Sequence, residues 1–166
     1  KELLSSAIEQ SPSGILITYT DETIPSVYNR QALELLGLSA PLGRQPMPGR
    51  VPFTLFTPAG TLVTLENQPL TRALRQGETV EGAEFRLVLS DGTERWIAAN
   101  AAPVRDAQGG IGAAVLVFHD ISALRQNERE LARFKFFLDS GVEEVYLVRP
   151  DGSVAYVNEA VARSLG

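Results

Sequence analysis

The side chains that most often carry catalysis or hold metals are scarce in this sequence, which has no cysteine and one histidine, His119. Without thiols there can be no disulfide, thiolate nucleophile, iron–sulfur cluster, thiolate zinc site or sulfur-linked cofactor. One imidazole without a carboxylate cluster does not make a zinc site either. No paired carboxylates or nucleophile–base pair stands out, and the glycines at 109, 110 and 112 lie in a predicted hairpin turn rather than before a helix. We therefore expect neither catalytic nor metal-binding residues in this chain.

His119 also lacks the setting that phosphotransfer needs. A phosphoacceptor histidine is presented by a helix, whereas residues 112–118 form an apolar run typical of a buried strand. Phosphotransfer through this residue is therefore not expected.

Composition narrows the class of protein further. The 166 residues are 44% hydrophobic, which is enough to form a core and argues against wholesale disorder. The net charge is −5, from 15 basic and 20 acidic residues, and no basic stripe with interleaved aromatics occurs, so we expect no nucleic-acid partner. No apolar run approaches the ~18 residues that span a bilayer. We expect no direct membrane contact in this segment, and the lack of cysteine fits a reducing, cytoplasmic location.

Hydrophobic periodicity divides the first third of the chain into short elements. Apolar residues at helical spacing predict a helix before residue 11, and β-branched runs predict strands at 15–19 and 27–28. A helix over 30–36 is closed by Gly37, where a left-handed residue is needed. Residues 38–67 carry five of the ten prolines, which leaves room only for short extended pieces at 51–56 and 62–65. This stretch is either a surface insertion or a mobile flap over a pocket.

After residue 68 the sequence predicts regular helices and strands more clearly. Pro69 starts a short helix over 70–76 that ends at Gly77. Runs at 84–89, 95–104 and 111–119, joined by short glycine-containing turns, predict an antiparallel meander. From residue 121 the period becomes helical through residue 137. Dimerisation and packing on its own domain explain this helix equally well, because its apolar heptad is interrupted by two charged residues: Ile121, Leu124, Leu131 and Leu138, with Glu128 and Lys135 on the seam.

The sequence also repeats itself. A shift of 129 residues aligns four identities without a gap, at turns and caps where residue type has a physical cause: Ser11 with Ser140, Asn29 with Asn158, Leu36 with Leu165, and Gly37 with Gly166. The predicted elements follow in the same order, and repetition at a fixed shift indicates a modular architecture. A piece of roughly thirty residues cannot bury enough surface to stand alone, so the second unit must fray, pack on the first copy or pair with another chain.

The order strand, strand, short helix, irregular segment, short helix and meander resembles the PAS fold. The resemblance lies in segments 7–15, 68–78, 91–96 and 101–106, and in an exit motif similar to the family's aromatic-x-Asp-Ile-Thr with Ser for Thr: Phe118-His119-Asp120-Ile121-Ser122. The proline-rich middle departs from the family, which often has small helices there. The resemblance implies an α+β fold, with an antiparallel sheet of about five strands, flanking short helices, and N-terminal and exit helices.

The resemblance also implies a domain organisation and a role. We expect a PAS domain at 1–121, a connecting signalling helix at 122–136 and the truncated start of a second PAS domain at 137–166. Such a sensory module either binds a small molecule and passes strain through its exit helix, or serves ligand-free for dimerisation and spacing. We expect a homodimer with a downstream effector domain in the same polypeptide. In bacteria that effector is commonly the histidine kinase of a two-component system, or else a cyclic-dinucleotide enzyme or transcription factor.

A ligand would lie between the sheet and the helices. The candidate pocket residues come from both: Ile17, Tyr19, Leu33, Leu36, Leu70, Leu74, Phe85, Leu87, Trp96, Ala98, Asn100 and Val115. Trp96 is either a sheet-face aromatic or a ring stacked on a ligand. The alanines at 98, 99, 101 and 102 leave room for a cavity or for close helix packing.

The cofactor is unknown from sequence. Composition excludes a cysteine-linked flavin or chromophore, and residues 70–76 contain no histidine that could hold haem. At the exit motif, Asp120, Ile121 and Ser122 are expected to fix the angle at which the helix leaves the sheet. Asp120 would do so by capping that helix or by pairing with an arginine.

Overall fold

The computed structural model describes residues 2–20, 26–39, 53–141 and 143–164. The chain divides into two compact units, Lys1–Ser122 and Ala123–Gly166. Among the described residues, no helix is both long enough and apolar enough to cross a membrane.

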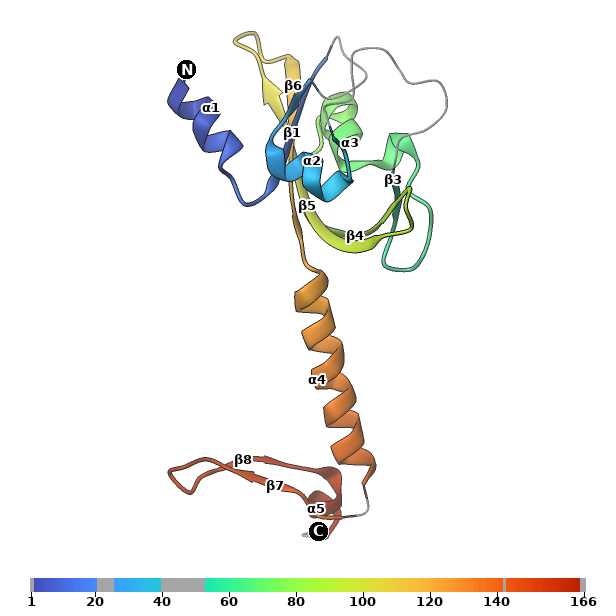
Figure 1. Cartoon of the computed structure of the whole chain (residues 1–166), viewed down its shortest axis with the longest axis vertical. Coiled ribbons are helices and arrows are strands. Elements are labelled where there is room, and N and C mark those ends of the chain that lie inside the picture. The colour runs from blue at the N-terminus through green and yellow to red at the C-terminus, as the bar shows by residue number, and fades with distance from the viewer. Residues whose placement is uncertain (1, 21–25, 40–52, 142, 165–166) are drawn as a thin grey trace. The chain divides into compact units, whose positions relative to one another are not determined.

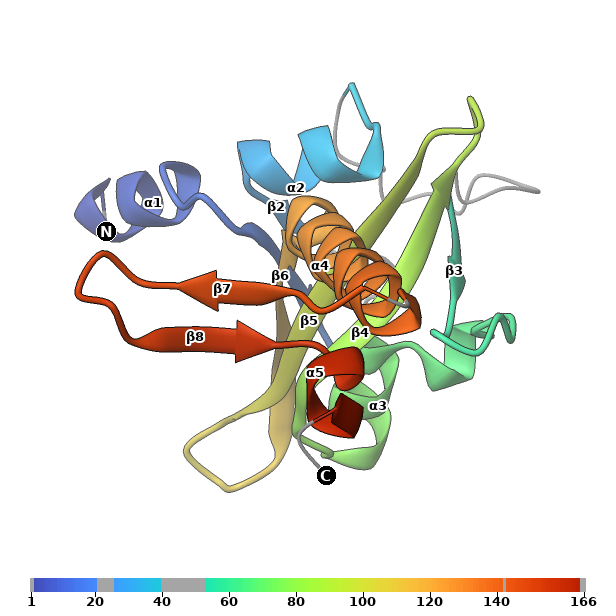
Figure 2. The same ribbon diagram turned by 90° about the horizontal axis from the view of Figure 1, so that it is seen from below.

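The first unit is built on a six-stranded antiparallel sheet with the order β2-β1-β6-β5-β4-β3 (Figure 1; turned in Figure 2). Its last three strands along the chain form the predicted meander. The first strand, β1, pairs with the last, β6, and β2 pairs with the other edge of β1. The α+β fold is confirmed, with six strands where about five were expected. Their bounds are β1 Gly14–Tyr19, β2 Val27–Tyr28, β3 Phe53–Phe56, β4 Val80–Leu89, β5 Glu94–Arg105 and β6 Ile111–Asp120.

Short helices cover one face of this sheet. They are α2 (Arg30–Leu36), the 3-10 turn η1 (Leu65–Asn67) and α3 (Pro69–Gln76). Both α-helices end at the predicted glycines, Gly37 and Gly77, each with φ of 67°, a conformation that glycine adopts without steric cost. The core lies between these helices and the inward residues of the strands.

The N-terminal helix α1 (Glu2–Glu9) is amphipathic, yet its apolar residues are not part of the core. Leu3 is 85% exposed and Leu4 is 68% exposed. This helix therefore carries an uncovered apolar face, in contrast to α2 and α3.

In the proline-rich stretch, β3 and an isolated bridge between Phe56 and Leu62 match the predicted extended pieces in part. Residues 40–52 lie outside the described residues, and the alternative of insertion or flap for them stays a prediction.

The second unit contains most of a long helix, a small hairpin and a short helix: α4 (Ser122–Ser140), β7 (Tyr146–Val148), β8 (Val154–Val157) and α5 (Glu159–Ser164). The helix α4 runs to residue 140, a few residues beyond the predicted end. The two strands form a separate two-stranded sheet, and their large apolar side chains are about half exposed.

Candidate functional site

The strongest local geometry is at the joint where β6 passes into α4. The pairing of β6 with β5 ends at Ile97 and Asp120. One residue further, the N–H of Ile121 still donates to the Trp96 carbonyl at 2.7 Å. The Trp96 N–H then donates to the Ser122 hydroxyl at 2.8 Å, so a side-chain oxygen replaces the next backbone acceptor. Ile121 and the first residue of the exit helix, Ser122, are thereby bonded to a central strand of the sheet.

Asp120 also contributes contacts at this joint, through both of its carboxylate oxygens. Its Oδ1 accepts the N–H of Ser122, the first residue of α4, at 2.7 Å. A carboxylate next to a helix N-terminus is favourable because the terminal N–H groups carry partial positive charge. Its Oδ2 lies 3.9 Å from the guanidinium of Arg95, and both side chains are about one-third exposed. Asp120 thus makes both of the contacts that the sequence left as alternatives.

Ile121 anchors the joint in the hydrophobic interior. It is 7% exposed, although its neighbours Asp120 and Ser122 carry polar side chains. A movement of β5 or β6 therefore cannot leave the first turn of α4 unchanged without breaking hydrogen bonds or exposing Ile121. The start of α4 is therefore held to the sheet by hydrogen bonds and by the buried side chain of Ile121.

Apolar side chains from both layers pack between the sheet and the helices. Six of the predicted pocket residues lie there: Leu36, Phe85 and Leu87 are buried, Leu70 and Leu74 pack against the core, and Leu33 is half-buried on α2. The helix α3 faces β5 and β6 through small residues, since Ala73, Ala101 and Ala114 are nearly inaccessible. The small residues on this face serve close helix packing.

The other six predicted pocket residues require a correction. The strand register and the burial pattern put them on the opposite face of the sheet, away from α2 and α3: Ile17, Tyr19, Trp96, Ala98, Asn100 and Val115. On β5 the inward residues are Ile97, Ala99 and Ala101. Which face of this strand points inward could not be predicted, because residues 96–99 are apolar on both faces. Asn100 is exposed and accepts the N–H of Gly82 at 2.7 Å, at the bulge of β4.

Thr18 and Tyr28 place polar groups on the covered side of the sheet. The Thr18 side chain is on the inward face of β1, opposite Ala114, and its buried hydroxyl has no hydrogen-bond partner among the described residues. Tyr28 packs against the core from β2, and burial raises the pKa of its phenol to about 12. The phenol therefore stays neutral near pH 7.

Sequence reasoning recognised Asn29 as a cap but missed its wider role. Asn29 is fully buried, and its amide Nδ2 donates to the carbonyls of Ile8 and Ser13, both at 2.9 Å. Its Oδ1 accepts the N–H of Ile15 at 2.8 Å and that of Ala32 at 2.9 Å. One side chain thus ties together the end of α1, the start of β1 and the start of α2.

Asn158 makes the same set of bonds in the second unit. It is 1% exposed, and its Nδ2 donates to the carbonyls of Leu138 at 2.9 Å and Glu143 at 2.8 Å. Its Oδ1 accepts the N–H of Val145 at 3.1 Å and that of Val161 at 3.3 Å. Asn158 therefore ties the end of α4 to β7 and α5. We call these two sets of bonds the Asn29 lock and the Asn158 lock.

The two locks refine the repeat. Asn29 and Ala32 correspond to Asn158 and Val161 at a shift of 129, whereas the bonded residues before the hairpin correspond at a shift of 130. The predicted alignment of Ser11 with Ser140 is therefore wrong by one residue. The second hairpin is one residue shorter, which an ungapped comparison could not detect.

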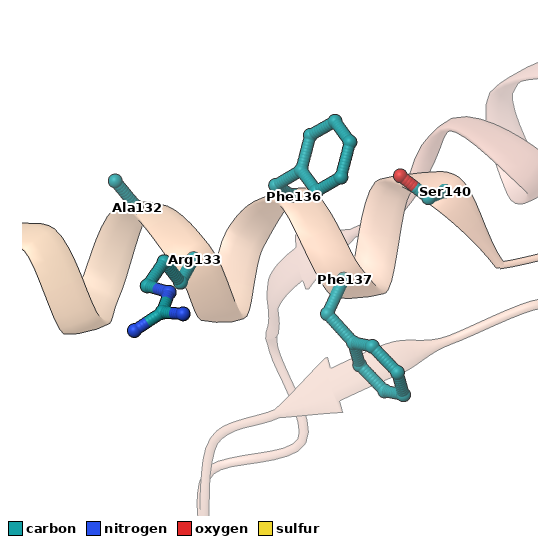
Figure 3. A pocket seen from close by; sticks show the side chains of 5 residues that line it. All are labelled: Ala132, Arg133, Phe136, Phe137 and Ser140. Atoms are coloured by element: carbon teal, nitrogen blue, oxygen red, sulfur yellow. The ribbon is translucent and has the colours of Figure 1, made fainter.

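An open hollow lies along the last turns of α4. Among the described residues, its lining comes from that helix: Ala132, Arg133, Phe136, Phe137 and Ser140 (Figure 3). Phe136 and Phe137 are both more than 70% exposed. Because one helix face forms it, this hollow is an uncovered apolar surface and encloses nothing.

Comparison with known proteins supports the fold. The PAS domain family matches residues 12–123, and no curated protein matches the chain. Three solved structures share the fold at low identity. An RNA-binding light-oxygen-voltage receptor has a TM-score of 0.57 and 19% identity over 80% of this chain, which spans only 36% of that receptor.

The other two structures are matched over nearly their whole length. A PAS domain from Colwellia psychrerythraea has a TM-score of 0.52 and 20% identity, covering 74% of this chain and 97% of that one. A sensory box histidine kinase/response regulator from Burkholderia thailandensis has a TM-score of 0.53 and 14% identity, covering 81% and 96%.

Proposed function

Because this chain belongs to the PAS domain family, we propose that it is a sensory relay module that transmits a conformational change from its sheet to its exit helix. The observation that carries the proposal is the set of hydrogen bonds that tie the joint between β6 and α4 to the neighbouring strand β5. Two backbone groups of Trp96 and the carboxylate of Asp120 hold the first turn of the helix. A strain in the central strands would therefore be delivered to α4.

The relay is tested by Asp120→Ala. This change removes the acceptor for the Ser122 N–H and the partner of Arg95, while the core stays intact. We expect hydrogen exchange in the first turn of α4 to become several-fold faster, in proportion to one lost hydrogen bond of about 1 kcal/mol. Signalling by the parent protein should weaken, with ligand affinity nearly unchanged.

Asp106→Ala is the matched control, because Asp106 accepts N–H groups in the turn between β5 and β6. Exchange in α4 should not respond to it. Unchanged exchange in α4 and unchanged output for Asp120→Ala would contradict the relay.

Binding of a small molecule between sheet and helices is a second candidate function. The Thr18 hydroxyl favours it, because a buried hydroxyl without a partner is costly and a bound polar group would satisfy it. The packing of large apolar side chains between sheet and helices favours instead a ligand-free module for dimerisation and spacing.

Native mass spectrometry of the whole chain with Thr18→Val separates these two possibilities. If a ligand binds, the wild-type chain carries extra mass that the variant loses. If the module is ligand-free, no extra mass is found and the variant melts at a higher temperature, because its unsatisfied buried hydroxyl is gone.

The proposal extends to the parent protein. The matching locks support a tandem arrangement, with the PAS domain at 1–121, a signalling helix at 122–136 and a second PAS domain starting at 137. We propose a cytoplasmic bacterial signalling protein with a histidine kinase or another effector downstream in the same polypeptide. We also propose a homodimer, since Leu124, Leu131 and Phe134 of α4 are each more than half exposed.

A further inference from the structure

The Asn158 lock bears on how a signal would leave α4, and an inference from it rests on the proposed relay. The helix begins with Ser122, which is bonded to β5, and ends with Ser140, two residues after the carbonyl of Leu138 that Asn158 binds. One continuous helix thus starts at the joint of the first unit and ends in the lock of the second.

The locks also show which element α4 replaces. In the first unit, the carbonyl of Ile8 near the end of α1 accepts from Asn29. In the second unit, the carbonyl of Leu138 near the end of α4 accepts from Asn158. The last turns of α4 therefore stand in the second unit where α1 stands in the first.

The backbone around each lock repeats as well. Asn29 donates its own N–H to the Ile15 carbonyl at 3.2 Å, and Asn158 donates to the Val145 carbonyl at the same distance. The residue three positions after each asparagine, Ala32 or Val161, is completely buried. The two locks therefore share their side-chain bonds, this backbone bond and the buried residue. Two asparagines that were only helix caps would need to share just the bond to the N–H three residues on.

We infer that Asn158 is the positioning residue through which α4 drives the second unit: α4 serves as the exit helix of one copy and the N-terminal helix of the next. The Nδ2 bond to the Leu138 carbonyl takes up the movement of α4, and the Oδ1 bonds from Val145 and Val161 pass it to β7 and α5. A helix that pulls on the carbonyl of Leu138 displaces the Asn158 amide. The same amide plane holds the N–H groups of Val145 and Val161, so β7 and α5 move with it.

The variant Asn158→Asp separates transmission from capping. Aspartate caps a helix as well as asparagine does, so the acceptor bonds to Val145 and Val161 are kept. It has no amide donors, so the bonds to the carbonyls of Leu138 and Glu143 are lost. We expect hydrogen exchange in residues 136–143 to become on the order of tenfold faster.

In the same variant, the N–H groups of Val145 and Val161 should keep their protection. Asn158→Ala, which removes donors and acceptor together, should expose all four groups. Asn29→Asp is the matched control and should loosen the end of α1 in the same way. If Asn158→Asp leaves exchange in residues 136–143 unchanged, the asparagine is only a cap and the inference is overturned.

Transmission is tested by combining variants in the whole chain. Asp120→Ala should speed exchange in β7 and β8 while Asn158 is present, and should add nothing in the Asn158→Asp background. Equal effects in both backgrounds would overturn the inference and leave the relay standing. No effect of Asp120→Ala on even the first turn of α4 would instead overturn the relay itself. Circular dichroism of each variant verifies that it is folded.

Discussion

At the scale of single residues, Phe118 packs directly over Gly14. Phe118 is 1% exposed and pairs with Gly14 across β1 and β6. A Cβ atom at residue 14 would lie 2.6 Å from Cζ of the ring, well inside van der Waals contact. The ring fits only because residue 14 has no side chain, and this glycine is needed for space and not for its backbone conformation.

We therefore expect Gly14→Ala to lower the free energy of unfolding by about 1–3 kcal/mol, the usual cost of overpacking a core. Denaturant unfolding of the purified chain measures it. Gly112→Ala is the control, since its added Cβ would meet Asp106 at an ordinary 3.8 Å. Equal stability of the two variants would contradict the packing argument.

We expect Tyr28 to make the stability of the first unit sensitive to alkaline pH. Burial raises the pKa of its phenol from 10.0 to about 12. The unfolded chain ionises first, so the contribution of the neutral phenol is complete below pH 10.0 and is lost as pH rises towards 12. Tyr28→Phe should flatten the fall in stability over this window.

The fluorescence of Trp96, the single tryptophan, follows the first unit in this experiment. Tyr156 provides the control, because its hydrogen bond to Asp139 also raises its pKa to about 12, but in the second unit. Tyr156→Phe should leave the Trp96 transition in place. A fall in stability that persists unchanged in Tyr28→Phe would rule out the assignment.

At the scale of elements, α4 offers a second heptad register for the proposed dimer, besides the one in which Glu128 and Lys135 lie on the seam. Leu124, Asn127, Leu131, Phe134 and Leu138 follow a spacing of three and four residues, so the charged residues flank this seam. With Leu124 at position a, Glu130 is at g and Lys135 at the following e, where they attract across a parallel pair of helices.

A charge exchange tests this pairing. Glu130→Lys alone should weaken the dimer by about two- to fivefold in Kd, since an exposed ion pair contributes a few tenths to 1 kcal/mol. Adding Lys135→Glu should restore it. Sedimentation equilibrium measures both, and failure of the double variant to recover would contradict the register. Because the chain has no cysteine, a mixture of the Leu124→Cys and Leu131→Cys chains should give 124–124 and 131–131 cross-links, and no 124–131 cross-link, in a parallel dimer.

The inward face of a strand could be predicted from the sequence only where polar residues identify the outward face. The alternation of β4 put Phe85 and Leu87 correctly in the core, because charged residues separate them. The run at 96–99 has no such marker, and Trp96 was assigned to the wrong face. The joint was predicted at Asp120 but not at Arg95 or Trp96, since their proximity depends on strand pairing. The Asn158 lock joins residues up to 20 apart, which local pattern cannot reveal.

At the scale of the whole molecule, the two units differ in how much they bury. The first has a six-stranded sheet with a continuous core. The second has a two-stranded sheet, and such a hairpin is at best marginally stable in water. Its apolar side chains are 41–57% exposed: Tyr146, Leu147, Val148, Val154 and Val157.

We therefore expect the rates of amide hydrogen exchange in the intact chain to differ between the two units. Amides of β7 and β8 are expected to exchange at least about a hundredfold faster than those where β5 pairs with β4 and β6, because local opening costs less there. Peptide-resolved mass spectrometry provides the comparison. Uniform protection across both sheets would mean that the second unit is stabilised by more than its own contacts.

The continuity of α4 also sets a rule for splicing this module into chimaeric receptors. Each residue inserted into a helix turns everything beyond it by about 100° and advances it by about 1.5 Å. Seven added residues bring the downstream part back to within about 20° of its original bearing, whereas two turn it to the far side. A graft made within α4 should therefore keep the length of this helix or change it in steps of seven residues. The recipient domain then keeps its rotation about the helix axis relative to the first unit, as the proposed relay requires.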